Sequence, residues 1–301
     1  QQEGPTPWQE AQRGGTSLTG DVARYLFWVH LRRGFRHLGG PQLSLVASLL
    51  ARARLPQHSK AMKEEIERSF PDCDAHVVAH RADLLWTRCM MEELLLDQLD
   101  ASSVQQWMVF EGREHLDAAL ERKKGVLLLF PHAGNVMLLI ALLSMAGYDL
   151  TQMAARGFHP DDSPSWFAKQ ARQAREQAED RLPAKFITPH DPPRLLYRAL
   201  ERNGILALTF DGRAGKKFVL TPFLEREALL STGPVRLAVS TGATVVPAMC
   251  LFDGRIHRLH LCPPRVAVGH GSRAERCERL FEDTLRRDLE PLLQKYPDHY
   301  A

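Results

Sequence analysis

The stretch GVLLLFPHAGN at positions 125–135 constrains the fold of this 301-residue chain more than any other. Its five apolar residues, Val126–Phe130, form a continuous run bounded by turn-forming residues. Such a run is typical of a strand buried on both faces of an open α/β sheet. Ligands of these sheets bind at the carboxyl ends of the strands, and the first polar group beyond this run is His132. The sequence therefore predicts a central strand with His132 at its functional edge.

Strand-like and helix-like segments alternate after position 125. Further strands are predicted at residues 150–155, 185–188, 205–210, 218–225 and 244–251, and an exposed antiparallel strand at 255–261. Helices are predicted at residues 137–146, 164–180, 192–202, 234–240 and 274–294. This alternation predicts an α/β fold with a central, mostly parallel mixed sheet flanked by helices.

The region before the sheet has a different pattern. Residues 1–20 are polar and patternless and predict a flexible tail, and residues 21–301 are predicted to form one domain, with a helical layer over 21–110 and an α/β core over 111–301. Within that layer, residues 21–38 combine aromatic residues and arginines, as in helices that lie at a membrane interface. A terminal helix packed on its own domain explains the pattern equally well.

Composition narrows the classes of partner. Lys and Arg number 39 against 36 Asp and Glu, a net charge of +3 that gives no reason to expect a nucleic-acid partner. The excess of basic residues is local, with twelve Lys or Arg against eight Asp or Glu over residues 151–217. An anionic ligand or a solvated face would explain it. Five scattered cysteines without CxxC spacing predict a reducing compartment, and no apolar run reaches the roughly 18 residues that would cross a bilayer.

Several common motifs are missing from the sequence. It contains no GxSxG, GxGxxG or GxxxxGK[ST] pattern, so no nucleotide or other cofactor is predicted. His257 and His260 are three apart on a predicted strand and hence on opposite faces, so no metal site is predicted there. Glu92 and Glu93 are adjacent on a predicted helix, and such carboxylates more often face solvent than take part in chemistry.

The order of several segments resembles a known family. They are His132 with Gly134 and Asn135 after one strand, Asp211 after another, TPFL at 221–224, STGPVRLAVSTGATVVP at 231–247, RSFPD at 68–72 and YPDHY at 296–300. Together they resemble the lysophospholipid acyltransferase superfamily, in particular its bacterial lipid A late acyltransferase branch. The resemblance implies a glycerol-3-phosphate acyltransferase-like fold. It also implies transfer of a fatty acyl group from an acyl carrier protein or coenzyme A thioester to a hydroxyl or amine.

The resemblance also implies a catalytic pair. In that family a histidine matching His132 is the general base, and an acid five positions later orients its ring. Here that position is Met137, whose thioether cannot accept the ring proton. Three explanations remain open: an engineered change, another carboxylate such as Asp211, Asp161, Asp162 or Asp191, or a scaffold that no longer catalyses.

Other roles follow from the chemistry of thioester attack, which needs donors for a developing oxyanion. Gly134 and Asn135 are the expected donors, and Met137 and Phe223 are expected to line an acyl groove, although a plain core helix also explains Met137. Four arginines are the expected anion-binding residues: Arg156, Arg213, Arg172 and Arg175.

The sequence thus predicts an acyltransferase with an acyl carrier protein or acyl-CoA donor and a lipid or metabolite acceptor that bears an anionic group. It is expected to be cytoplasmic and peripheral on the inner face of the membrane. Two alternatives remain: a carrier-linked condensing or acylating enzyme of secondary metabolism, and a catalytically silent module that binds lipid or carrier protein. Met137 favours the silent module.

Overall fold

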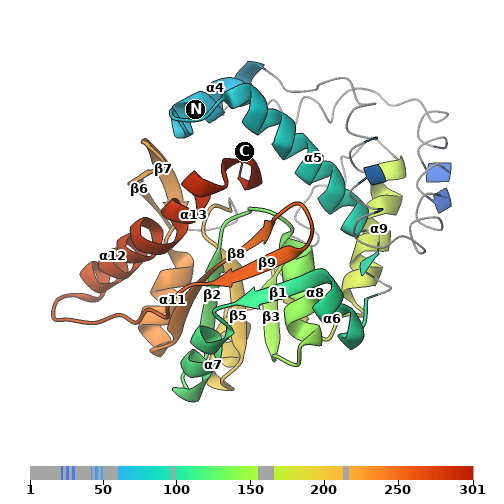
Figure 1. Ribbon diagram of the computed structural model, residues 1–301. Coiled ribbons are helices and arrows are strands. Elements are labelled where there is room, and N and C mark those ends of the chain that lie inside the picture. Colours follow the sequence, from blue (N-terminus) through green and yellow to red (C-terminus); the bar gives the residue numbers. More distant parts are fainter. Residues whose placement is uncertain are drawn as a thin grey trace.

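The fold is built on a seven-stranded, mostly parallel sheet (Figure 1). The computed structural model describes residues 60–93, 95–96, 99–154, 166–212 and 217–300, with scattered residues between 22 and 49. Across the sheet the strand order is β1 (Met108–Glu111), β9 (His257–Leu261), β8 (Thr244–Phe252), β2 (Val126–Phe130), β5 (Ile205–Thr209), β3 (Leu150–Met153) and β4 (Lys185–Ile187). Neighbouring strands are parallel except at the β8–β9 pair. The predicted fold class is confirmed, and so is an antiparallel strand after β8. The prediction that this strand is exposed was wrong, because β9 lies between β1 and β8 and buries His257, Leu259 and Leu261.

Helices cover both faces of this sheet. In the fully buried strand β2, Val126, Leu128 and Phe130 belong to the core that includes residues of α7 (Arg113–Glu121) and α8 (Val136–Met145). Leu127 and Leu129 point to the other face, where the core includes residues of three helices: α10 (Arg194–Glu201), α11 (Gly233–Thr241) and α12 (Arg273–Thr284). The strand's period of two thus explains why every residue of the run is apolar.

A helical layer lies along the upper edge of the sheet in Figure 1. It contains α4 (Lys60–Ser69) and α5 (Ala75–Glu93). The short α6 (Val104–Trp107) follows in the chain, lies lower in the view and leads into β1. Helices thus occupy much of residues 60–107, whereas the predicted tail over 1–20 and most of the predicted interfacial helix over 21–38 lie outside the described residues. Within the described part of the chain, no helix has the length and apolar character needed to cross a bilayer.

The C-terminal segment returns to the same edge. After α12 the chain continues through a π-helical turn, Leu285–Leu289, then α13 (Glu290–Lys295) and a 3₁₀ turn, Pro297–His299. This last turn contacts α5, and Figure 1 places it between α5 and the strands. On the other side, α9 (Trp166–Glu179) runs beside the lower end of α5.

A separate two-stranded sheet lies beside the main one. It is the antiparallel hairpin β6 (Phe218–Phe223) and β7 (Arg226–Ser231). The prediction of a single edge strand over 218–225 missed β7, because the turn residues Leu224 and Glu225 adopt positive φ without the glycine or asparagine that marks such turns. The short strand β1 was also missed.

Candidate functional site

Strand register brings His132 and Asp211 together. In the parallel pair β2 and β5, Phe130 lies opposite Thr209. His132 and Asp211 each follow two residues beyond these partners, so both emerge at the same point of the carboxyl edge. The structure therefore brings together the two residues that the sequence predicted to be catalytic.

Asp211 holds His132 at two points. One carboxylate oxygen, Oδ1, lies 2.7 Å from Nδ1 of the ring, and the other, Oδ2, accepts a hydrogen bond of 2.8 Å from the His132 backbone N–H. The histidine side chain is 59% exposed, while that of the aspartate is only 9% exposed. The hydrogen bond to Asp211 raises the pKa of His132 above its ordinary value, against the opposing effect of burial. An orienting carboxylate on Nδ1 leaves Nε2 as the nitrogen for proton transfer.

Position 137, where the family resemblance predicted an acid, belongs to the core. Met137 is 6% exposed and packs with Leu96, Ala141, Ala178 and Leu182. Of the other acids considered as replacements, Asp191 accepts hydrogen bonds from Thr188, and Asp161 and Asp162 lie outside the described residues. Asp211 is therefore the acid that stands beside the His132 ring.

The expected oxyanion donors already have partners. The Gly134 backbone N–H donates to the His299 carbonyl oxygen at 3.0 Å, and the Asn135 side-chain amide donates to Glu92 at 2.8 Å. Asn135 is 2% exposed, and its Oδ1 accepts from the Leu138 N–H to cap α8. These contacts argue against an oxyanion role for the two residues.

Gly134 is required by its surroundings. Its φ is +63°, and a Cβ at this position would lie 1.9 Å from the Cys250 carbonyl oxygen. Only glycine meets both conditions, because L side chains rarely adopt this φ and cannot overlap a backbone oxygen. The residue therefore fixes the close approach of the His132 loop, residues 131–135, to β8.

The C-terminal segment completes the surroundings of the pair. The His299 ring accepts a hydrogen bond of 2.8 Å from the Phe252 N–H through Nε2. Burial raises the pKa of Tyr300, and the neighbouring charge of Asp211 and the hydrogen bond to it act in the same direction. The ring of Tyr300 also packs against Phe223, with the centroids 6.1 Å apart. Phe223 is 4% exposed within the main core, which favours a packing role over an acyl-groove role.

The four predicted anion-binding arginines are only partly visible. Arg156, Arg213 and the side chain of Arg172 lie outside the described residues. Arg175 forms ion pairs with Glu179 at 3.1 Å and Glu93 at 3.4 Å. Its charge is therefore already balanced by two carboxylates.

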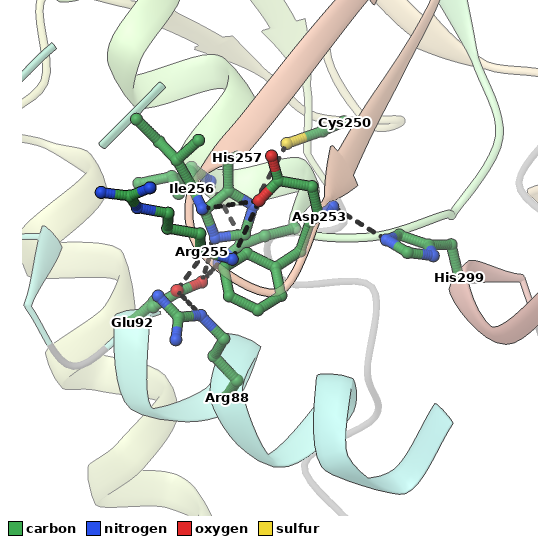
Figure 2. Close-up of polar contacts among 11 residues, drawn as sticks. Arg88, Glu92, Cys250, Asp253, Arg255, Ile256, His257 and His299 are labelled. Atoms are coloured by element: carbon green, nitrogen blue, oxygen red, sulfur yellow. Dashed lines mark hydrogen bonds and ion pairs between the residues drawn. The ribbon is translucent and has the colours of Figure 1, made fainter. Parts of the chain in front are cut away.

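A second histidine–carboxylate pair lies in the interior, and sequence analysis missed it (Figure 2). Glu92 of α5 is 1% exposed, and both its carboxylate oxygens lie 2.9 Å from Nε2 of His257 on β9. Arg88, one helical turn earlier, approaches Glu92 at 2.6 Å and stacks over the Phe252 ring at 3.9 Å. Burial alone would raise the pKa of Glu92, but His257, Arg88 and Asn135 hold that pKa below its ordinary value.

One sequence signal could have revealed that His257 is buried. His257 alternates in phase with Leu259 and Leu261, which are both buried, so its side chain had to point inward. A buried polar ring needs a partner, and the structure supplies Glu92 of α5, which no local signal in the sequence singles out. The expectation that both Glu92 and Glu93 face solvent was wrong for Glu92. Over the described ranges, no three His, Cys, Asp or Glu side chains are placed to hold a metal ion.

The mostly parallel sheet, with a histidine and a carboxylate paired at its carboxyl edge, defines an α/β protein whose site geometry suits general acid–base chemistry. The chain belongs to the family of bacterial lipid A biosynthesis acyltransferases, whose family model matches residues 26–273. The resemblance stated from the sequence is thereby confirmed.

Individual relatives come from mycobacteria. A phosphatidylinositol mannoside acyltransferase of Mycobacterium tuberculosis is 29% identical over 153 residues, which is 49% of this chain and 45% of the relative. A protein of the same name from Mycolicibacterium smegmatis is 25% identical over 175 residues, 56% of this chain and 54% of the relative. The chain thus spans about half the length of the curated relatives it matches.

Proposed function

We propose that this protein is an acyltransferase that moves a fatty acyl group from a thioester donor to a hydroxyl of a lipid acceptor, with His132 as general base. The observation that carries the proposal is the 2.7 Å contact between Asp211 and Nδ1 of an exposed His132 ring at the carboxyl edge of the sheet. Membership of an acyltransferase family gives the reaction class.

The proposed reaction assigns each proton. Nε2 of His132 takes the proton of the acceptor hydroxyl as its oxygen attacks the thioester carbonyl carbon, and Asp211 stabilises the resulting imidazolium. The tetrahedral intermediate collapses by breaking the carbon–sulfur bond. The leaving thiolate then takes the proton from His132, so the products are an ester and a free thiol.

The donor is proposed to be an acyl carrier protein or coenzyme A thioester, and the acceptor a lipid with an anionic headgroup. The names of the mycobacterial relatives support a glycosylated phospholipid acceptor over a soluble metabolite. The alternative of a catalytically silent binding module loses its main support. Although position 137 carries no acid, the Asp211 carboxylate contacts the His132 ring.

Contact with a membrane surface is proposed for the β6–β7 hairpin. Phe218, Leu220 and Leu229 are 38%, 58% and 64% exposed, and the two leucines are cross-strand partners. The opposite face of the hairpin buries Thr221, Phe223 and Leu230, and Phe223 packs on Phe210, the residue before Asp211, with ring centroids 5.8 Å apart. Exposed apolar residues so close to a lipid-modifying site suit partial insertion at the interface.

The reaction is tested by mixing the protein with an acyl carrier protein thioester or acyl-CoA and a phosphatidylinositol mannoside, then measuring free thiol and acylated lipid. Both products are expected to form in equal amounts with at least one donor. Replacement of His132 by Ala is expected to abolish them. Equal turnover by the His132→Ala variant would refute the assignment.

The membrane contact is tested by cosedimentation with vesicles of phosphatidylglycerol and phosphatidylcholine. The combined Leu220→Asp and Leu229→Asp variant is expected to lose most binding, because it places charge on the inserted face. Val268, which is 70% exposed outside the hairpin, supplies the matched control Val268→Asp. Equal vesicle binding by all three proteins would exclude the hairpin as the contact.

A further inference from the structure

The loop that carries His132 ends at Asn135, a buried residue whose side chain makes two hydrogen bonds. Asn135 caps α8 through its Oδ1, which accepts a hydrogen bond of 2.9 Å from the Leu138 N–H. Its Nδ2 donates a hydrogen bond of 2.8 Å to Oε2 of Glu92. Both ends of the amide are therefore fixed, and the position of the loop depends on a helix more than 40 residues away in sequence.

Glu92 cannot turn away from Asn135 without losing other contacts. Both of its oxygens lie 2.9 Å from Nε2 of His257, and Oε1 is 2.6 Å from Nε of Arg88 (Figure 2). The Phe252 ring packs against Arg88 and against His257, whose other nitrogen lies 3.8 Å from the Cys250 sulfur. The carboxylate is thus oriented from three sides inside the protein.

Stability alone does not account for this cluster. Burying ionic groups has a large desolvation cost, and apolar residues of similar volume often give equal or greater stability. An apolar cluster would also hold α5 on the strands. A carboxylate, unlike an apolar side chain, fixes the direction of the Asn135 amide, and only two residues separate Asn135 from His132.

The rest of the loop has little freedom to absorb a shift of Asn135. Gly134 is held by the His299 carbonyl oxygen and lies against the backbone of Cys250, and His132 is held by Asp211 through its backbone N–H and its ring. A displacement at Asn135 would therefore strain these contacts, including the one between His132 and Asp211.

We propose that Glu92 is a positioning residue for His132, acting through the side chain of Asn135. The proposal rests on the proposed function, because it assumes that His132 is the general base. Glu92 does not touch substrate, and it places the loop so that the His132 ring meets Asp211 at hydrogen-bond distance.

The test compares Glu92→Gln, Asn135→Ser and the double variant with the unmodified protein. Serine caps helices as well as asparagine does but is too short to reach Glu92. Asn135→Ser should therefore keep the cap of α8 and remove the hydrogen bond to Glu92. Asp288→Asn is the matched control, because Asp288 is also a buried carboxylate paired with an arginine, Arg265, but does not contact the His132 loop.

Each single variant is expected to lower kcat by about 10- to 100-fold with little change in KM, as expected for a misplaced catalytic group. The acidic limb of the pH–rate profile should move to lower pH, because a weaker contact with Asp211 lets the pKa of His132 fall. The double variant should add little to either single variant, since both break the same connection. Asp288→Asn should lower stability and leave the acidic limb unchanged.

Titration of the His132 ring by nuclear magnetic resonance keeps the test independent of turnover. A His132 pKa that falls in Glu92→Gln and Asn135→Ser supports the positioning role even if the acyl acceptor was chosen wrongly. Variants with an unchanged ring pKa and an unchanged acidic limb would overturn the proposal. If Glu92→Gln does not fold, Asn135→Ser decides the outcome alone.

Discussion

Two histidine–carboxylate pairs in this protein have similar separations but different surroundings. His132 and Asp211 meet at 2.7 Å at the rim of the sheet, where the histidine side chain is 59% exposed. His257 and Glu92 meet at 2.9 Å inside the protein, where both side chains are 1% exposed. The distance between partners does not separate the two pairs, whereas access to solvent does.

Their surroundings explain the different uses. An exposed ring can exchange a proton with a substrate, and a carboxylate on its far nitrogen makes it a better base. A ring sealed beside Glu92 and Phe252 cannot reach a substrate, so its pairing with Glu92 takes no direct part in proton exchange with one. A histidine–carboxylate pair therefore indicates an active site only where the ring is accessible.

The largest expected difference between the pairs concerns the reaction rate. Asp211→Asn should lower kcat by about 10⁴-fold, because an amide no longer stabilises the imidazolium or enforces its tautomer. The free energy of unfolding should fall by about 1–3 kcal/mol, because the Asp211 side chain is only 9% exposed and its contacts with His132 would be weakened. Thiol release and urea denaturation measure the two quantities. A rate within tenfold of the original would show that the outer pair is not catalytic.

The inner pair should show its effect in stability. Glu92→Leu should lower the free energy of unfolding by about 3–5 kcal/mol, since Arg88 and His257 would lose their buried carboxylate. Replacing all three residues together, as Arg88→Met, Glu92→Leu and His257→Phe, should restore most of that loss. Denaturation curves test both. If the triple variant is as unstable as the single one, the charges themselves are needed for folding.

A substitution at position 137 should have an effect of intermediate size on stability. Met137→Glu would recreate the family spacing after His132, but the new carboxylate would lie among Leu96, Ala141 and Leu182. It should lower the free energy of unfolding by on the order of 3 kcal/mol and should not raise kcat. Met137→Leu, a swap of similar volume, is the control and should cost less than about 1.5 kcal/mol. A large gain in rate would mean that Asp211 is a poor substitute for the missing acid.

The smallest expected effect is a difference in pH dependence. Asp211 raises the pKa of His132, so this contact stabilises the protein fully below the unfolded pKa of about 6.5 and is lost as pH rises through the folded pKa. The free energy of unfolding of the unmodified protein should exceed that of the His132→Gln variant by less than about 1 kcal/mol near pH 6. This difference should vanish well above the folded pKa of His132.

The contribution of Glu92 to the free energy of unfolding changes with pH in the opposite direction. Because the pKa of Glu92 is lowered, its contribution is present above the unfolded pKa of about 4.3 and lost as pH falls through the folded pKa. Urea denaturation across the pH range measures both trends. If both contributions to stability changed with pH in the same direction, the charges assigned to His132 and Glu92 would be wrong.

Much of the outer pair could be predicted from sequence, because its signals are local. A buried strand ends at Phe130 and another at Thr209, and a polar residue, His132 or Asp211, stands two positions beyond each end; parallel neighbours align such ends. What the sequence left open was which acid replaces the one missing at Met137. Strand order decided that question, since it placed β5 and not β3 or β4 beside β2.

The inner pair was missed because its partners are 165 residues apart and neither lies in a recognisable motif. Glu92 looks like any surface glutamate on a helix until the packing of α5 on β8 and β9 is known. The same limit applies to Gly134 and Asn135. Their residue types suggested donors for an oxyanion, but the tertiary structure had already given those donors partners in Glu92 and His299.

The alignment of β2 with β5 has a consequence for how related enzymes can be found. Where base and acid sit on adjacent strands, backbone pairing fixes their meeting, and the chain between them is free to lengthen or shorten. A search that demands a set number of residues between histidine and acid will pass over such proteins. A search that first finds the strand paired with the histidine-bearing strand, and then examines the residues after the end of that neighbouring strand, will recover them.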